Sequence, residues 1–357
     1  MSADRVAYTS LLHQASFTKT EAYLLQLKTG EKTAGVLLQK ALYSREIDAL
    51  TVLEFIECLL NTKKTQIFAE SSVFGDGSDW NLTELGILGD ISMAMEVEVF
   101  DNGLHRFPQV HSSSFKALLI YIPGALLRNG TGNAPADWEE VTVDDQISYE
   151  AFYDLYERRI LPCLLYANDI AFSRGVKTIV TIPGLGCGQF AGKFKGQLGT
   201  KLKQVLHDLL TKYATQLPSI CAIYFDPFDE CENERIEVSH ISLLVRPLLK
   251  GNEGKGQLCS PGNYGDRKEE FNDCFLTSLV AWDHVSWPGN DFYIGSRATD
   301  DGVKAAATNT MEIMTLYAGK YCVDANCYQP PNGYYNWGDV VTRNAISLVC
   351  NTNSKIY

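Results

Sequence analysis

Short apolar runs alternate with helical segments along most of this chain, and this alternation constrains its fold more than any other feature. The clearest runs are residues 116–122 (KALLIYI) and 178–182 (TIVTI), and Pro-Gly closes both. Further strands are predicted at residues 220–225, 240–245 and 276–282, and helices at about 149–174, 197–214 and 302–318. Strands that are apolar on both faces must be covered on both faces, so the pattern predicts a layered α/β fold with a mostly parallel central sheet.

The amino-terminal part has a different pattern. Residues 1–65 place apolar side chains at helical spacing, and Gly30 separates two such stretches. We therefore predict a helical extension over residues 1–65 and a ligand-binding, catalytic domain over 66–357. The extension could serve as a structural brace, a lid or an arm that binds a partner.

The charge of the chain limits its partners. A net charge of -12 argues against binding to nucleic acid, which usually requires a concentrated basic surface. Backbone amides can still hold the phosphates of a small ligand, and an acidic surface can attract a cation such as an arginine side chain. The start, MSADRVAYTS, lacks the pattern of a signal peptide, and no apolar run is long enough for a membrane span. We expect a cytoplasmic protein that binds no membrane.

Glycine is concentrated in residues 183–192 (PGLGCGQFAG), directly after a predicted strand and before a predicted helix. Glycine lets the backbone approach a ligand closely, and successive amides near a helix start can cradle an anion. The segment could therefore hold a diphosphate, or it could be a tight turn without a ligand. The residues that we expect to touch a ligand here are Gly184, Gly186, Cys187, Gly188, Gln189 and Phe190. Cys187 also permits a thiol hydrolase as an alternative, because a nearby helix start would lower its pKa.

A second segment that is rich in residues able to bind or react is residues 281–302 (AWDHVSWPGNDFYIGSRATDDG), at the end of the predicted strand 276–282. Its four carboxylates are Asp283, Asp291, Asp300 and Asp301, and Trp287, Gly289 and Asn290 lie among them. Either Asp300 or Asp301 could simply cap the following helix, with Thr299 as a competitor, and we favour Asp300 for that role. His284 is expected to be a solvent-exposed or core histidine. In parallel sheets ligands bind beyond the carboxyl ends of the strands, which places this segment and the glycine-rich one at the predicted site.

These two segments resemble the ligand loops of macrodomains. The spacing of Asp283, Asp291 and Asp301, eight and ten residues apart around W-P-G-N-D, is similar to that in the arginine-specific, MavL-type macrodomain ADP-ribosylhydrolases. The resemblance implies a three-layer α/β/α sandwich with a mixed, mostly parallel sheet. The usual N-A-A-N loop is absent and the acidic loop follows the glycine-rich one, which suggests a rearranged strand order.

The resemblance further implies removal of ADP-ribose from arginine side chains of modified proteins, by hydrolysis of an N-glycosidic bond. It implies Asp283, Asp291 and Asp301 as catalytic residues, with Asp291 and Asp301 nearest the distal ribose and Asp283 orienting the arginine. Trp287, Gly289 and Asn290 are expected to contact the ligand. We expect ADP-ribose as ligand and product, an ADP-ribosylated protein as partner, no cofactor, no metal and a monomeric protein.

Two other functions remain open at this point. The chain could be a macrodomain that binds ADP-ribose without cleaving it, or a protein-interaction module built on the helical extension. Adenine contacts could come from Asp226 or from the aromatic residues within 328–337 (YQPPNGYYNW), although the latter could equally cap the core. Residues 251–266, rich in Gly with Pro and Asn, are predicted to form a mobile loop.

Overall fold

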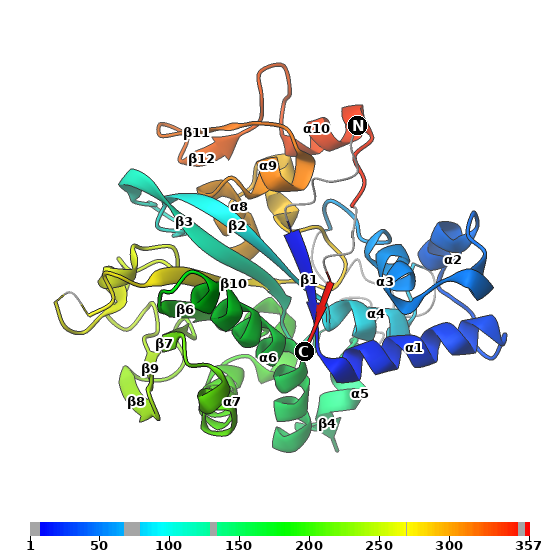
Figure 1. The fold of residues 1–357 in the computed structure, drawn as a ribbon, viewed down its shortest axis with the longest axis horizontal. Coiled ribbons are helices and arrows are strands. Elements are labelled where there is room, and N and C mark those ends of the chain that lie inside the picture. The colour runs from blue at the N-terminus through cyan, green and yellow to red at the C-terminus, as the bar shows by residue number, and fades with distance from the viewer. Residues whose placement is uncertain (1–7, 68–78, 129–133, 269, 349–353) are drawn as a thin grey trace.

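A mixed nine-stranded sheet forms the centre of the computed structural model, which describes residues 8–67, 79–128, 134–268, 270–348 and 354–357 (Figure 1). Its order, within these residues, is β13-β1-β2-β3-β10-β6-β7-β9-β8. These strands are β1 (Tyr8–Leu12), β2 (Ser92–Asp101), β3 (Val110–Pro123), β6 (Thr178–Pro183), β7 (Ile220–Asp226), β8 (Glu234–Val238), β9 (Ile241–Val245), β10 (Phe275–Trp282) and β13 (Ser354–Ile356). Small hairpins pair β4 (Thr142–Val143) with β5 (Gln146–Ile147) and β11 (Lys320–Cys322) with β12 (Cys327–Gln329).

The central strands are parallel, as predicted. Strands β3, β10, β6, β7 and β9 run in one direction, and β2 and β8 run against their neighbours. Strand β10 comes late in the chain but lies between β3 and β6. The acidic segment after β10 and the glycine-rich segment after β6 therefore leave the same edge of the sheet from neighbouring strands.

Helices cover both faces of the sheet, which completes the predicted sandwich. Helices α6 (Tyr149–Ser173) and α7 (Leu198–Tyr213) pack on one face, and α8 (Asp300–Ala307) and α9 (Thr310–Thr315) contact strands on the other. Successive side chains of β3 point alternately to the two faces of the sheet. Leu118 and Ile120 join the core under α6 and α7, whereas Leu119 and Tyr121 join the core on the opposite face. This alternation follows from the two-residue repeat of a strand.

The amino-terminal region is helical but begins differently from the prediction. Helices α1 (Gln14–Lys28), α2 (Val36–Leu42), α3 (Val52–Leu60) and α4 (Leu82–Gly89) gather beside the sheet at the right of Figure 1. The correction concerns β1, which is a strand paired with β2 and β13 rather than part of a helix. Tyr23 and Phe55 share one core with Val97 of β2. A separable unit ending at residue 65 remains a prediction.

The predicted helix over residues 302–318 is broken in two. Asn309 lies between α8 and α9, where its side-chain oxygen accepts from the Glu98 amide at 2.8 Å and its own amide donates to the Glu98 carbonyl. These bonds to β2 replace helical ones, so the chain turns at this point. Other helices are α5 (Trp138–Val141), η1 (Ile47–Ala49), η3 (Gln189–Phe194), η4 (Ala214–Gln216), η5 (Pro261–Tyr264), η6 (Asn290–Ile294) and α10 (Trp337–Asn344). No helix in the described part of the chain is long and apolar enough to cross a membrane.

Candidate functional site

A cavity of about 800 Å³ lies beyond the carboxyl ends of the central strands. Pro183, Asp226 and Trp282, the last residues of β6, β7 and β10, line it. Its volume is within the range of roughly 300–1,000 Å³ that is common for small-molecule sites. Both segments that the sequence singled out contribute to its wall.

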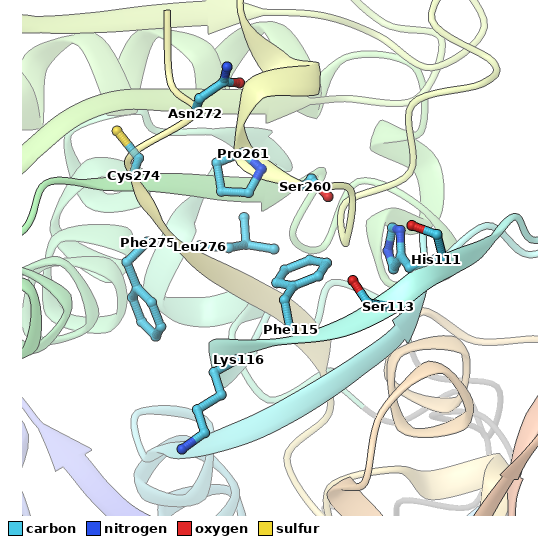
Figure 2. A pocket seen from close by; sticks show the side chains of 11 residues that line it. His111, Ser113, Phe115, Lys116, Ser260, Pro261, Asn272, Cys274, Phe275 and Leu276 are labelled. Carbon is cyan, nitrogen blue, oxygen red and sulfur yellow. The ribbon is translucent and has the colours of Figure 1, made fainter. Parts of the chain in front are cut away.

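A second hollow of about 330 Å³ lies at the opposite end of β10, where Phe275 and Leu276 begin the strand (Figure 2). The view shows Phe115 beside Leu276 and Pro261 there. Its described lining residues include no carboxylate and none of the predicted site residues. The larger cavity is therefore the candidate site.

The glycine-rich segment faces the cavity throughout its predicted ligand contacts. Gly184, Gly186, Cys187, Gly188, Gln189 and Phe190 all line the wall. Gly186 has a φ of 71°, and a Cβ there would lie 2.8 Å from the Ala125 nitrogen. The loops after β3 and β6 thus touch backbone to backbone. Tyr156 fastens them together, because its hydroxyl donates to the Leu185 carbonyl and accepts from the Ala125 amide.

The helix that follows this segment does not offer a free amino terminus. Helix α7 begins at Leu198, and the Glu230 carboxylate accepts from the Gly199 amide at 2.6 Å. Glu230 itself lines the cavity. The start of α7 already holds an anionic side chain. The prediction of an anion cradle can therefore apply only to the loop amides other than those of Leu185 and Cys187, which donate to the Pro183 and Gly184 carbonyls.

The surroundings of Cys187 do not favour a nucleophilic thiolate. Its thiol is buried, and burial together with the charge of Glu230 raises its pKa well above the usual value. The nearby helix start was expected to lower this pKa, which was wrong because the thiol is buried and because Glu230 adds negative charge beside it. Since the thiolate is the reactive form, the burial and the raised pKa of the Cys187 thiol argue against the thiol-hydrolase alternative.

Asp283 lines the cavity directly after β10, but its own loop uses both of its oxygens. Oδ1 accepts from the amides of Val285 and Ser286 at 2.7 and 2.6 Å, and Oδ2 accepts from the Ser286 hydroxyl at 2.5 Å. Asn290, also on the wall, donates to Oδ2 at 3.3 Å and accepts from the Ile67 amide. The pair fixes the shape of the wall beside the cavity.

Asp291 is not among the residues that line the cavity. Its Oδ2 accepts from the Ala298 and Thr299 amides, and its Oδ1 accepts from the Thr299 hydroxyl at 2.5 Å. A Cβ on Gly302 would lie 1.7 Å from Oδ1, so the carboxylate fits only because that residue is glycine. Asp291 thus holds the entrance to α8 in place.

Asp301 combines burial, a cavity position and an unpartnered oxygen. It is 2% exposed and lines the cavity; Oδ1 is bonded to Thr299 and Gly302, while the buried Oδ2 has no hydrogen-bond partner. Burial, then the charge of Asp283, raises its pKa well above the usual range. The Thr299 hydroxyl lies 2.6 Å from Asp301 and 2.5 Å from Asp291, yet it has one hydrogen to donate. A proton on Asp301 satisfies the second contact, in agreement with the raised pKa.

Asp300 does not cap the helix, contrary to the prediction. Thr299 is the N-cap, and its hydroxyl accepts from the Gly302 amide. Asp300 instead accepts from the Ala281 amide at 2.8 Å and pairs with the fully buried Lys304 at 2.9 Å. Thr299 therefore caps α8, while the Asp300 carboxylate forms an ion pair with the buried Lys304 ammonium group.

Trp287 and Gly289 lie behind the wall rather than on it. Trp287 is buried, and its indole N–H donates to the Lys63 carbonyl at 3.2 Å. Gly289 has a φ of 97°, and a Cβ there would lie 3.1 Å from both Ala305 and Met311. Neither lines the cavity, so the prediction that they contact the ligand directly gains no support from their positions.

A buried ion-pair network begins at His284, which lines the cavity, and extends beneath the cavity wall. His284 contacts Asp137 at 3.3 Å, and Asp137 pairs with Arg159 of α6 at 2.7 Å. Burial acts to raise the pKa of Asp137, but Arg159 and His284 hold that pKa well below its usual range. Asp137 also accepts from the Leu126 amide, and Arg159 also pairs with Asp90. His284 is a core histidine, as expected, and the network joins the loops after β3 and β10.

Asp226 lines the cavity at the end of β7. Its Oδ1 accepts from the Phe228 and Leu248 amides, each at 2.8 Å. Burial, with a smaller contribution from Asp300, raises its pKa to about 6. The aromatic segment 328–337 contributes none of the cavity's described lining residues, and its Tyr328 and Trp337 stack in the core. Tyr328 and Trp337 therefore belong to the core, whereas Tyr335 between them is exposed.

The parts of the wall that were not predicted from the sequence include two that long-range contacts hold in place. One is the loop 103–105 after β2, which Arg297 holds by donating to the Leu104 carbonyl and pairing with Asp101 at 2.6 Å. The other is Gln257, whose segment 251–266 was expected to be mobile. That segment instead buries Leu258, Cys259 and Tyr264 in the core. Neither part carries a local motif, since its position depends on partners distant in sequence.

Comparison with known proteins places this chain in a family. A family model described as the macrodomain effector MavL matches residues 8–334, whereas a search of curated proteins gave no match. Because the matched region covers most of the chain, the chain belongs to the MavL macrodomain effector family. The match confirms the resemblance and, with the mixed, mostly parallel sheet, the macrodomain-like α/β fold.

Proposed function

We propose that this member of the MavL macrodomain effector family hydrolyses the N-glycosidic bond between ADP-ribose and an arginine side chain of a modified protein. Membership of a macrodomain family supports a function related to ADP-ribose. The aspartates of the segment after β10 support hydrolysis, and specificity for arginine rests on the spacing of Asp283, Asp291 and Asp301.

The observation that carries the proposal is Asp301. A buried carboxyl group with a raised pKa and one free oxygen costs stability, and such groups are concentrated at functional sites. A general base works best when its pKa lies near the working pH, which an ordinary aspartate does not achieve. Asp301 is therefore suited to exchange a proton with water or substrate.

The glycine-rich loop is assigned to the diphosphate. Its residues from Gly184 to Phe190 line the cavity, and backbone amides of such a loop can hold phosphate oxygens without a basic side chain. With the diphosphate on this loop, the distal ribose extends along the wall toward the acidic segment, because β6 and β10 are neighbours. The adenosine half would then lie toward the end of β7, near Asp226.

The proposed reaction is a displacement at the anomeric carbon of the distal ribose. Water attacks that carbon, the carbon–nitrogen bond breaks toward nitrogen, and the guanidine leaves. Asp301 accepts a proton from the water as the bond forms. The ribose gains positive charge in the oxocarbenium-like transition state, as in glycoside hydrolysis, and the negative charge of Asp283 stabilises it.

Asp291 is assigned a positioning role. It contacts Thr299, which in turn contacts Asp301, and it does not line the cavity. Removing its charge would alter the orientation and the pKa of Asp301 rather than a direct contact with substrate. This revises the expectation that Asp291 lies beside the attacked ribose.

The test begins with calorimetric titration of the protein with ADP-ribose. It continues with an assay for release of ADP-ribose from arginine-modified protein, and glutamate-modified protein serves as the control substrate. Binding with release from arginine supports the proposal. Binding without release identifies a reader of ADP-ribose, and failure to bind removes both functions.

A further inference from the structure

Gln257 is a buried residue of the cavity wall whose side-chain amide is only half satisfied. The residue is 6% exposed and lines the cavity, and its Oε1 accepts from the Lys304 ammonium group at 2.8 Å. An ammonium group only donates, so the amide oxygen must face Lys304 and the amide nitrogen must face away from it. Among the residues that the structure describes, this nitrogen donates to no acceptor. It is not fully covered by protein either, so an N–H donor is left open to the cavity.

Asp300 places an acceptor beside this donor through the same lysine. Its Oδ2 accepts from Lys304 at 2.9 Å and from the Ala281 amide at 2.8 Å. Its Oδ1 accepts no hydrogen bond from the described part of the chain, and Asp300 lines the cavity. Lys304 also donates to the Leu279 carbonyl at 2.8 Å, which fixes the ammonium group against β10. One buried cation therefore orients a free amide donor and a free carboxylate acceptor on the same wall.

The backbone around Gln257 is held firmly in place. Its carbonyl accepts from the Thr181 hydroxyl of β6 at 3.1 Å, and the next amide, that of Leu258, donates to the Asn102 carbonyl at 3.1 Å. A Cβ on Gly256 would lie 1.9 Å from the same Asn102 oxygen, so the chain before Gln257 also packs closely there. A donor on a fixed backbone loses little freedom when a ligand binds, which favours a role in recognition.

The position of this pair decides which part of a ligand it can meet. The contact with Thr181 places Gln257 beside β6, and the contact with Ala281 places Asp300 at the end of β10. In the proposed function the diphosphate lies on the loop after β6, and the distal ribose extends toward the segment after β10. The pair lies where that ribose would pass. Ribose carries neighbouring hydroxyls, each of which can both accept and donate a hydrogen bond, so a donor beside an acceptor suits it.

Resting on the function proposed above, we propose that Gln257 and Asp300 bind the hydroxyls of the distal ribose. The Gln257 amide donates to one hydroxyl oxygen, and Oδ1 of Asp300 accepts from a hydroxyl hydrogen. These contacts hold the ribose beside Asp301, which follows Asp300 in the chain and lines the same cavity. A buried site that hydrogen-bonds a hydroxyl discriminates against ligands that lack it, because its own polar groups are then left unpaired. The pair therefore distinguishes ADP-ribose from ADP, which has no distal ribose.

The test compares calorimetric Kd values for ADP-ribose and for ADP. Gln257→Met removes the amide donor and should weaken ADP-ribose binding by about three- to tenfold, the range that one lost hydrogen bond gives. ADP binding should change by less than about twofold, because ADP makes no contact with the pair. The matched control is Gln189→Met, the same chemical change on the glycine-rich segment assigned to the diphosphate. Both ligands carry the diphosphate, so this control should change the two affinities by the same factor.

Gln257→Glu keeps an acceptor for Lys304 and gives the same comparison if loss of that bond prevents Gln257→Met from folding. Its added negative charge disfavours ADP at least as much as ADP-ribose, because the terminal phosphate of ADP carries more charge. A selective loss of ADP-ribose affinity therefore still supports the ribose contact. Equal losses for the two ligands, or no loss for ADP-ribose, would overturn the inference and leave the proposed function standing. Failure of the wild-type protein to bind ADP-ribose would instead overturn the proposed function, and this inference with it.

Discussion

Replacing Asp301 with asparagine is expected to stabilise the protein and to remove most of its activity. Asparagine keeps the shape of the side chain, and its oxygen can still accept from Gly302. It loses the negative charge that burial and Asp283 disfavour. Because the folded pKa is raised, the folded state binds the proton more tightly than the unfolded chain does. Wild-type stability therefore falls as pH rises from the ordinary aspartate pKa of 3.8 through the folded value, and the variant should escape this loss.

The size of the effect follows from the raised pKa, because asparagine carries no charge to be disfavoured. Each unit by which the folded pKa exceeds the ordinary value costs the wild type about 1.4 kcal/mol of stability above that pKa. Unfolding entropy of about 2.1 cal/mol/K per residue gives roughly 0.75 kcal/mol/K for 357 residues. The variant should therefore melt higher than the wild type at pH 7.5, by roughly 2 °C for each such unit. Its kcat for ADP-ribosyl-arginine should fall by about 10²–10⁴-fold, the usual contribution of a general base.

Calorimetric melts at pH 5 and pH 7.5 and a turnover assay test both halves of this prediction. The matched control is Asp300→Asn, which leaves the buried Lys304 without its carboxylate and should destabilise the fold by roughly 3–5 kcal/mol. Neighbouring aspartates would then respond in opposite directions. A lower melting temperature for Asp301→Asn at pH 7.5, or turnover close to the wild type, would refute the reasoning.

Three further changes test the supports of the site. Gly186→Ala should destabilise the fold by about 1–3 kcal/mol, because residue 186 has a φ of 71° and a Cβ there would contact the Ala125 backbone. It should also weaken ADP-ribose binding. Thermal melting measures the first effect and calorimetric titration the second. Cys187→Ala should change KM but leave a measurable kcat, because burial disfavours the thiolate form that a nucleophile requires. Loss of kcat with an unchanged KM would instead support Cys187 as a nucleophile. Asp137→Asn should lower the urea unfolding free energy by roughly 3–5 kcal/mol, since Arg159 loses a buried partner, and unchanged stability would contradict the network.

The sequence predicted the central strands and the position of the site because these depend on local patterns. Apolar runs predicted β3, β6, β7, β9 and β10, and the carboxyl-end rule for parallel strands placed the cavity. Strand β2 was not among the predicted strands, although residues 95–99 (MEVEV) show the alternating polarity that is typical of a half-buried strand. Strand β1 has five residues and depends on pairing with β2 and β13, which no local pattern records.

The division of work among the aspartates could not be predicted in the same way. Asp291 and Asp301 belong to one short segment, yet one lies behind the wall and the other on it. The difference arises from hydrogen bonds with Ala298 and Thr299 and from the missing side chain of Gly302. Asp137, which contacts His284, is 147 residues away in sequence. Contacts of this kind are decided by tertiary packing, so composition and spacing carry no record of them.

A single proton on Asp301 links the stability of this site to its proposed chemistry. The protonated form satisfies the contact with Thr299 and avoids repulsion from Asp283, so folding favours it. The base form is required to accept a proton from water. Stability should therefore fall, and turnover should rise, as pH increases through the raised pKa of this group. If Asp301 is a catalytic base whose ionised form destabilises the fold, stability and kcat should change in opposite directions over the same pH range. A purely structural aspartate would change stability with pH but leave the pH profile of kcat unchanged.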